Sequence, residues 1–171
     1  RGGRGLQGAK AKEEDFVEHL FVANTHDYIL FFTDKGKCHW LKVHEIPPGG
    51  RAARGRAIVN LLRTEPGEKV KAFVSVKTFD EDKFIVMATR KGIIKKTKLS
   101  AYGKPRKGGI YAIDIREGDE LIEAKITNGE NDIVLGTREG KSIRFPETDA
   151  RPTGRKTMGV IGIKLSKKDD Y

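Results

Sequence analysis

The stretch Phe31-Phe32-Thr33-Asp34-Lys35-Gly36 has two counterparts later in the chain, Met87-Ala88-Thr89-Arg90-Lys91-Gly92 and Leu135-Gly136-Thr137-Arg138-Glu139-Gly140. In each, apolar residues typical of a strand lead through a threonine and two charged residues to a glycine. Because glycine is free to take a positive φ, each stretch predicts a tight turn between two strands. The turn glycines lie 56 and 48 residues apart. A repeat of this length is typical of propeller or solenoid arrays, in which each unit completes its core against its neighbours.

A short basic segment follows each turn and leads into another apolar stretch: Arg51-Ala52-Ala53-Arg54-Gly55, Arg106-Lys107-Gly108-Gly109 and Arg155-Lys156-Thr157-Met158-Gly159. The opening residues Arg1-Gly2-Gly3-Arg4-Gly5 match the same landmark. We therefore expect residues 1–171 to form one repeat array, with 1–15 the tail of a preceding blade and blades at 16–62, 70–115 and 121–165. Because the chain opens on the tail of a repeat, we expect it to be a piece of a longer array.

The pattern of apolar residues predicts an all-β chain. Gly and Pro separate short apolar stretches, and no stretch of 11 or more residues keeps a helical period. About four strands fall in each unit. Because long basic loops precede the fourth strand, we expect that strand to cross to a neighbouring unit. The expected strands are 16–23, 28–33, 38–43, 57–62, 70–76, 84–89, 93–99, 110–115, 121–127, 132–136, 142–145 and 160–165.

The composition of the chain indicates which class of partner it could bind. The chain has 34 Lys and Arg against 24 Asp and Glu, a net charge of +10 and a pI near 9.7. This excess favours a polyanion such as nucleic acid or an anionic membrane surface, although a merely soluble basic protein has the same composition. No apolar run approaches the roughly 18 residues of a membrane span, so membrane insertion is excluded. The single cysteine, Cys38, cannot form an internal disulfide, which suits a reducing cytosol.

The positive charge is concentrated in particular segments. Residues 90–109 hold eight basic residues and no acidic one, whereas acids gather in segments such as 13–15, 65–68 and 117–123. Because a repeat places equivalent residues on one face, these basic segments predict a stripe that binds a phosphate backbone. The predicted DNA-binding residues are Arg1, Arg4, Arg51, Arg54, Arg56, Arg90, Lys91, Lys95, Lys96, Lys98, Lys104, Arg106, Lys107, Arg138, Lys141, Arg144, Arg151, Arg155 and Lys156.

Sequence-specific readout and catalysis are not indicated. Most Phe residues lie inside apolar strand runs, and we expect Trp40, which aligns with Lys96 and Arg144, to pack or cover the strand rim, with nucleic-acid contact as the alternative. Gly140-Lys141-Ser142 resembles the end of a P-loop, but position 135 is Leu where that motif needs Gly. The four histidines show no zinc-ligand spacing with Cys38. We therefore expect no active site, metal or cofactor in this segment.

At several stretches the chain resembles the C-terminal domain of the A subunit of bacterial DNA gyrase. These are 16–23 with 28–33, then Ile46-Pro47-Pro48-Gly49-Gly50 running on to Gly55, and Gly140 to Phe145 followed by Arg151 to Arg155. Arg1 to Gly5 matches the end of the family's gyrase box, Gln-Arg-Arg-Gly-Gly-(Lys/Arg)-Gly, whose first Gln-Arg pair is absent here. The resemblance covers essentially the whole chain. It implies a β-pinwheel, a propeller-like array whose four-stranded blades exchange strands, with about three blades present.

The resemblance also implies a function. Such a domain wraps double-stranded DNA around its basic outer edge without reading sequence, so that an ATP-dependent type II topoisomerase introduces negative supercoils. In that enzyme the catalytic tyrosine belongs to another region of the A subunit, while the B subunit hydrolyses ATP with Mg²⁺. The implied partners are therefore DNA and the rest of a cytoplasmic, nucleoid-associated heterotetramer. We expect the Arg1 to Gly5 segment to fix the end of the bend, unless it is a frayed tail.

Three alternatives remain at this level. The paralogous topoisomerase IV subunit shares the pinwheel, and the gyrase-box remnant speaks against it. A propeller-type protein-interaction scaffold would need an apolar or mixed-charge face where this chain is basic. A β-propeller enzyme would need convergent acidic or histidine side chains, which the sequence does not suggest.

Overall fold

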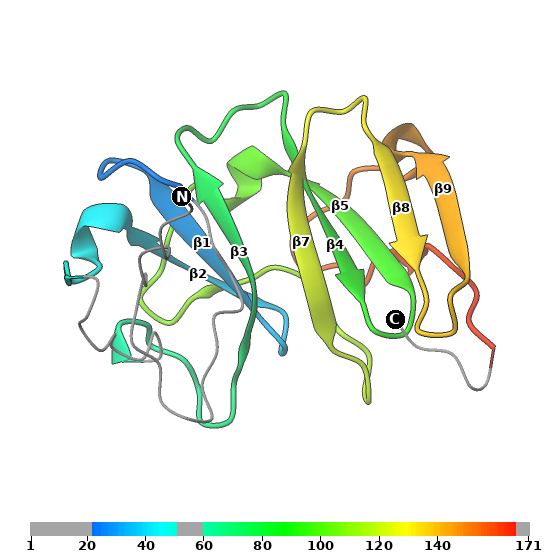
Figure 1. The fold of residues 1–171 in the computed structure, drawn as a ribbon, viewed down its shortest axis with the longest axis horizontal. Coiled ribbons are helices and arrows are strands. Elements are labelled where there is room, and N and C mark those ends of the chain that lie inside the picture. Colours follow the sequence, from blue (N-terminus) through cyan, green and yellow to red (C-terminus); the bar gives the residue numbers. More distant parts are fainter. Residues whose placement is uncertain (1–21, 51–59, 167–171) are drawn as a thin grey trace, which may run out of the picture.

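The computed structural model describes residues 22–50 and 60–166, and there the chain is a series of strands joined by loops and short 3₁₀ turns (Figure 1). The 3₁₀ turns are η1 (Val43–Glu45), η3 (Leu99–Tyr102) and η4 (Glu147–Asp149). The strands are β1 (Tyr28–Thr33), β2 (Lys37–Lys42), β3 (Val70–Val76), β4 (Phe84–Thr89), β5 (Ile93–Lys98), β6 (Ile110–Tyr111), β7 (Leu121–Thr127), β8 (Asp132–Gly136), β9 (Ser142–Pro146) and β10 (Val160–Ile161).

The three repeated stretches form the hairpins β1–β2, β4–β5 and β8–β9. In each turn the threonine hydroxyl accepts the N–H of the residue four positions on, at 3.3 Å for Thr33, 3.2 Å for Thr89 and 3.1 Å for Thr137. The glycine N–H donates to the same threonine's carbonyl at 3.0 Å in all three turns. One turn chemistry therefore sets the geometry of every blade, as the sequence pattern predicts.

Each four-stranded sheet takes its hairpin from one repeat and its two outer strands from the next. The first sheet has the order β3-β1-β2-β6 and the second β10-β5-β4-β7, whereas the third is the hairpin β8-β9. The predicted crossing of the fourth strand to a neighbouring unit is thus confirmed, and so is the all-β, strand-exchanging pinwheel. The sheets differ from the blades expected at 70–115 and 121–165, because β3 and β7, the first strands of those units, also pair with the preceding hairpin.

The crossing strands β6 and β10 are shorter than the predicted 110–115 and 160–165. β6 pairs with β2 only at Lys37 and Cys38, where β2 begins. Beyond that point the hairpin turns away, and the N–H groups of Ala112 and Ile113 both donate to the carbonyl of Gly36. Gly162 and Ile163 donate to the carbonyl of Gly92 in the same way. The ladder ends because the partner strand has reached its turn.

Two apolar cores lie between successive sheets, which stand side by side in Figure 1. The larger core joins the first two sheets through side chains such as Leu30 and Phe32 from β1 and Ile85 and Met87 from β4, which are all fully buried. The smaller core includes Ala88 and Ile94 of the second sheet and Leu135 of the third. The blades therefore depend on one another for both hydrogen bonds and apolar burial.

Two further strand predictions fall largely on residues that the structure does not describe. The expected strand 16–23 lies outside the described ranges except for its last two residues, which are not in a strand. Of the expected strand 57–62, the described residues 60–62 form a turn instead of a strand.

The turn glycines provide a test of strand exchange. Gly92 and Gly140 have nearly the same conformation, with φ of 88° and 83°. A Cβ on Gly92 would lie 2.5 Å from the carbonyl oxygen of Ile163 in the crossing segment, but a Cβ on Gly140 would meet nothing within 4 Å. We expect Gly140→Ala to lower the free energy of unfolding by about 1–2 kcal/mol from backbone strain alone.

Gly92→Ala should cost about 2–5 kcal/mol, because overpacking against the crossing segment adds to that strain. Urea unfolding of both variants measures the difference. Equal losses for the two alanines would mean that the crossing segment does not hold the turn in solution.

Candidate nucleic-acid interface

Two loops of the described chain carry positive charge with no acid among it. The first, residues 103–109, precedes β6, and the second, residues 150–159, precedes β10; neither contains Asp or Glu. We call them the crossing loops. Each runs from one blade to the preceding hairpin, so the strand exchange places it along the rim of the array. Their exposed cations are Lys104, Arg106, Lys107, Arg151 and Lys156, and Arg155 is half-buried.

The crossing loops meet at Tyr111, which follows the first loop and is 52% exposed. The Arg155 guanidinium donates to the Tyr111 carbonyl at 3.0 Å, and the N–H of Asp114 donates to the carbonyl of Thr157 at 3.0 Å. The ammonium groups of Lys156 and Lys37 lie 5.6 and 5.9 Å from the Tyr111 ring centroid. Tyr111 and Lys37 thus belong to the same surface, although the sequence pattern assigns neither of them to it.

Lys98 joins this surface, since it is exposed at the end of β5 and lines a hollow with Pro152, Thr153 and Gly154 of the second crossing loop. β5 contains three lysines, and nothing in the residues beside them shows which lysine faces solvent. The register of β5 against β4 and the second loop decides it.

Lys95 and Lys96, both predicted to bind DNA, are buried, with exposures of 1% and 4%. The Lys96 ammonium lies 3.0 Å from a carboxylate oxygen of Glu147 and 4.3 Å from the Phe84 ring centroid. The Lys95 ammonium donates to the carbonyls of Ala112, at 2.6 Å, and Arg155. These two lysines hold the crossing segments together and are not available to a phosphate on the surface, which corrects the sequence prediction.

The electrostatics of these buried groups follow from their partners. Burial and, to a smaller extent, the nearby Arg155 charge lower the pKa of Lys95 to about 7, against the opposing effect of Asp114. Burial alone would raise the pKa of Glu147, but the Lys96 ammonium and hydrogen bonds from Asn131 and Thr127 outweigh it, so that this pKa lies below its usual value. Glu147 is therefore an ionised partner for Lys96 at neutral pH.

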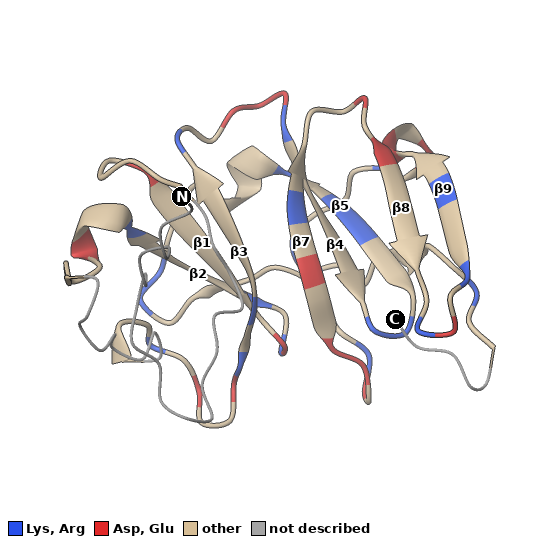
Figure 2. Cartoon of the chain, in the orientation of Figure 1, with Lys and Arg blue, Asp and Glu red and all other residues tan. Residues whose placement is uncertain are grey.

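The predicted residues on the hairpins lie among acids. The Arg90 guanidinium donates to the Gly118 carbonyl at 3.0 Å, and the backbone N–H of Lys91 donates to the Asp119 carboxylate at 3.0 Å. Arg144 Nε lies 3.7 Å from an Asp132 carboxylate oxygen. Arg138 and Lys141 are exposed on either side of Glu139. Figure 2 shows both signs of charge on the β1–β2 and β8–β9 turns and on β7, in contrast with the purely basic crossing loops.

The remaining predictions fall outside the interface or outside the described residues. Arg1, Arg4, Arg51, Arg54 and Arg56 lie in the ranges that the structure does not describe. Trp40 packs edge-on against Tyr28, with ring centroids 5.0 Å apart, and lies 6.3 Å from Phe79, so its expected packing role is confirmed. Within residues 22–50 and 60–166, His, Cys, Asp and Glu form no group that could hold a metal ion. Over the same ranges no helix has the length and apolar character to cross a membrane.

Comparison with known proteins places this geometry in a family. A family model described as the DNA gyrase C-terminal domain, beta-propeller, matches residues 1–24, 27–77, 83–128 and 131–170. The DNA gyrase A subunit of Clostridium acetobutylicum is 52% identical over 162 residues, which cover 95% of this chain and 20% of the relative. The corresponding gyrase protein of Haemophilus influenzae is 48% identical over 170 residues, or 99% of this chain and 19% of the relative. The chain thus spans about a fifth of the length of these relatives.

Two solved structures are similar in fold. The C-terminal domain of a DNA topoisomerase IV superposes with a TM-score of 0.81 at 27% identity, over 96% of this chain and 51% of that one. A DNA gyrase A C-terminal domain superposes with a TM-score of 0.74 at 21% identity, over 98% of this chain and 55% of that one.

The two kinds of lysine on β5 can be separated by mutation. Lys96→Ala would leave Glu147 buried and unpaired, so we expect the free energy of unfolding to fall by about 3–5 kcal/mol. Lys98→Ala, two residues further along the same strand, should change it by less than about 0.5 kcal/mol. Urea unfolding followed by circular dichroism measures both. A fully stable Lys96→Ala protein would contradict the buried ion pair.

Proposed function

We propose that this chain, which belongs to the DNA gyrase C-terminal domain family, binds double-stranded DNA without sequence preference and bends it around its basic rim. The observation that carries the proposal is the separation of charge: the crossing loops contain Lys and Arg but no Asp or Glu, whereas the hairpin turns have an acid beside their cations, either within the turn (Asp34, Glu139) or, for Lys91, at Asp119 of another loop. A surface of this kind attracts a phosphate backbone at any sequence.

Strand exchange holds the basic crossing loops in fixed positions, which is what bending a DNA duplex requires. A bent duplex of a few tens of base pairs costs on the order of several kcal/mol in elastic energy, which distributed phosphate contacts must offset. Contacts can do so only if they are held on a rigid curved support. The Lys95 ammonium fixes the second crossing loop to the second sheet through the Arg155 carbonyl, and the buried pair Lys96–Glu147 fixes η4, which leads into that loop. The Arg155 guanidinium also fixes the loop to the backbone at Tyr111.

The wider role is proposed with the domain. In a type II topoisomerase the chain would present bent DNA for strand passage, so that the ATP- and Mg²⁺-dependent enzyme introduces negative supercoils. Its partners would be the rest of the A subunit, together with the B subunit, in the bacterial cytoplasm. The gyrase role is favoured over the topoisomerase IV role, because the relatives at 48% and 52% identity are gyrase subunits. The crossing-loop residues are the DNA contacts on this proposal, and Tyr111 and Lys37 join them.

Binding that depends on phosphates has a characteristic response to salt. We expect log K for a linear duplex to fall linearly with log salt, at a slope of about −0.9 for each phosphate contact. The double variant Arg151→Gln/Lys156→Gln should make the slope shallower by about 1.8, because it removes two contacts. Fluorescence anisotropy of a labelled duplex measures the slope.

The control is Lys77→Gln/Lys83→Gln, which removes the same charge from exposed lysines beside the acidic segment 80–82. It should leave the slope unchanged. Equal slopes for the two double variants would mean that the crossing loops do not contact the duplex, and a strong preference for one duplex sequence at fixed salt would contradict backbone recognition.

A further inference from the structure

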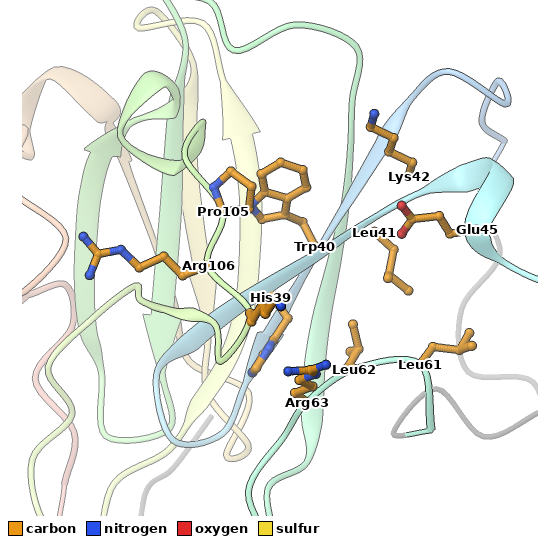
Figure 3. Close-up of a pocket in the computed structure, with 11 residues that line it drawn as sticks. His39, Trp40, Leu41, Lys42, Glu45, Leu61, Leu62, Arg63, Pro105 and Arg106 are labelled. Carbon is orange, nitrogen blue, oxygen red and sulfur yellow. The ribbon is translucent and has the colours of Figure 1, made fainter.

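A cavity of about 350 Å³ opens beside the first blade, where one edge of β2 lacks a neighbouring strand among the described residues. β6 pairs with β2 only at Lys37 and Cys38, so the edge from His39 to Lys42 has no described strand beside it. The first crossing loop passes this edge on one side, and the segment 61–63 lies on the other, as Figure 3 shows. The cavity therefore lies between two loops on the basic rim.

The cavity is lined by more donors and cations than acceptors. Its charged residues are the cations Lys42, Arg63, Arg106 and Lys107 and a single acid, Glu45, all of them exposed. Its wall includes Trp40, whose indole N–H is buried and has no hydrogen-bond acceptor among the described residues. The excess of cations over acids favours an anionic group in this cavity.

The second blade fills the corresponding place with its own atoms. Lys96 of β5 occupies the position of Trp40, the fourth residue after the turn glycine. There Pro152 bridges to Lys96, the N–H of Thr153 donates to the Lys96 carbonyl at 2.8 Å, and the ammonium pairs with Glu147.

The first blade lacks that internal partner. Glu147, which pairs with Lys96 of the second blade, is the seventh residue after the turn glycine of the next repeat, Gly140. The corresponding residue for the first blade is the seventh after Gly92, which is the uncharged Leu99. Among the described residues, no backbone hydrogen bond joins the first crossing loop to Trp40. Among residues 22–50 and 60–166, nothing fills this cavity in the way that Glu147 and the second crossing loop fill the corresponding site of the second blade.

We propose that this cavity seats one phosphate group of the bound duplex, held by Arg63, with Lys107 of the first crossing loop lining the same cavity. The inference rests on the proposed DNA-binding function and deepens it. It assigns a contact to Arg63, which lies outside the basic segments singled out in the sequence, and it makes the two blades unequal. The first blade grips a phosphate in a cavity, and the second presents only its surface cations.

Trp40 allows a direct test, because it is the only tryptophan of the chain and lies in the cavity wall. A labelled duplex is titrated into the protein while duplex anisotropy reports binding and Trp40 emission reports the cavity. Arg63→Gln is compared with Arg116→Gln, an exposed arginine before the acidic segment 117–120 whose loss removes the same charge. Circular dichroism checks that both variants are folded.

We expect Trp40 emission to change in proportion to the bound duplex. Arg63→Gln should reduce the salt slope by about 1 and suppress the emission change, and Arg116→Gln should do neither. If the duplex binds and Trp40 emission does not respond, or if both variants have the wild-type slope, the cavity assignment is wrong while DNA binding stands. If the wild-type protein shows no salt-dependent duplex binding, the proposed function itself fails.

A separate arm distinguishes a DNA phosphate from a free one. Inorganic phosphate replaces chloride at constant ionic strength, without DNA. An Arg63-dependent emission change with phosphate, together with no change on adding duplex, would show a site for free phosphate and overturn the assignment to DNA.

Discussion

The structure depends on two crossing segments whose N–H groups reach the carbonyl of a turn glycine in the preceding hairpin. Ala112 and Ile113 donate to Gly36, and Gly162 and Ile163 donate to Gly92. These bonds attach a strand of one repeat to the hairpin of the preceding repeat, so each four-stranded sheet needs two repeats. The larger apolar core likewise contains side chains from two sheets. The loops that lead into the crossing segments must then run along the rim. Those exposed loops are also the segments where the sequence has basic residues without acids.

The same contacts explain why cations of one short strand have different roles. On β5, Lys95 and Lys96 stay inside because the second crossing loop and Glu147 close over them, and Lys98 lies beyond that cover. On β2 the equivalent positions carry His39 and Trp40. Burial lowers the pKa of His39 against the opposing pull of Glu68, so the first blade has a neutral ring there. The two blades have the same strand arrangement but different side chains at these two positions, and a cavity lies beside the first blade.

Local pattern predicts the hairpins well, because Thr33, Gly36 and their counterparts encode the turn within a few residues. Strand exchange is also accessible from sequence, since long loops before the fourth strands are incompatible with tight hairpins. The pairing of β3 and β7 with the preceding hairpin cannot be predicted in this way, because the order of polar and apolar residues within a strand does not depend on which distant strand it pairs with. For the same reason the sequence wrongly predicts Lys95 and Lys96 to be surface cations: their burial depends on residues of other segments, such as Glu147.

The central claim is that crossing segments join the blades into one cooperative unit, and native-state hydrogen exchange tests it most directly. The amides of Ala112 and Gly162 should exchange with the same free energy of opening as core amides of β1 and β4, because releasing a crossing segment would open the blade it completes. Exchange of these two amides by local opening, at a free energy several kcal/mol below that of the cores, would contradict the account.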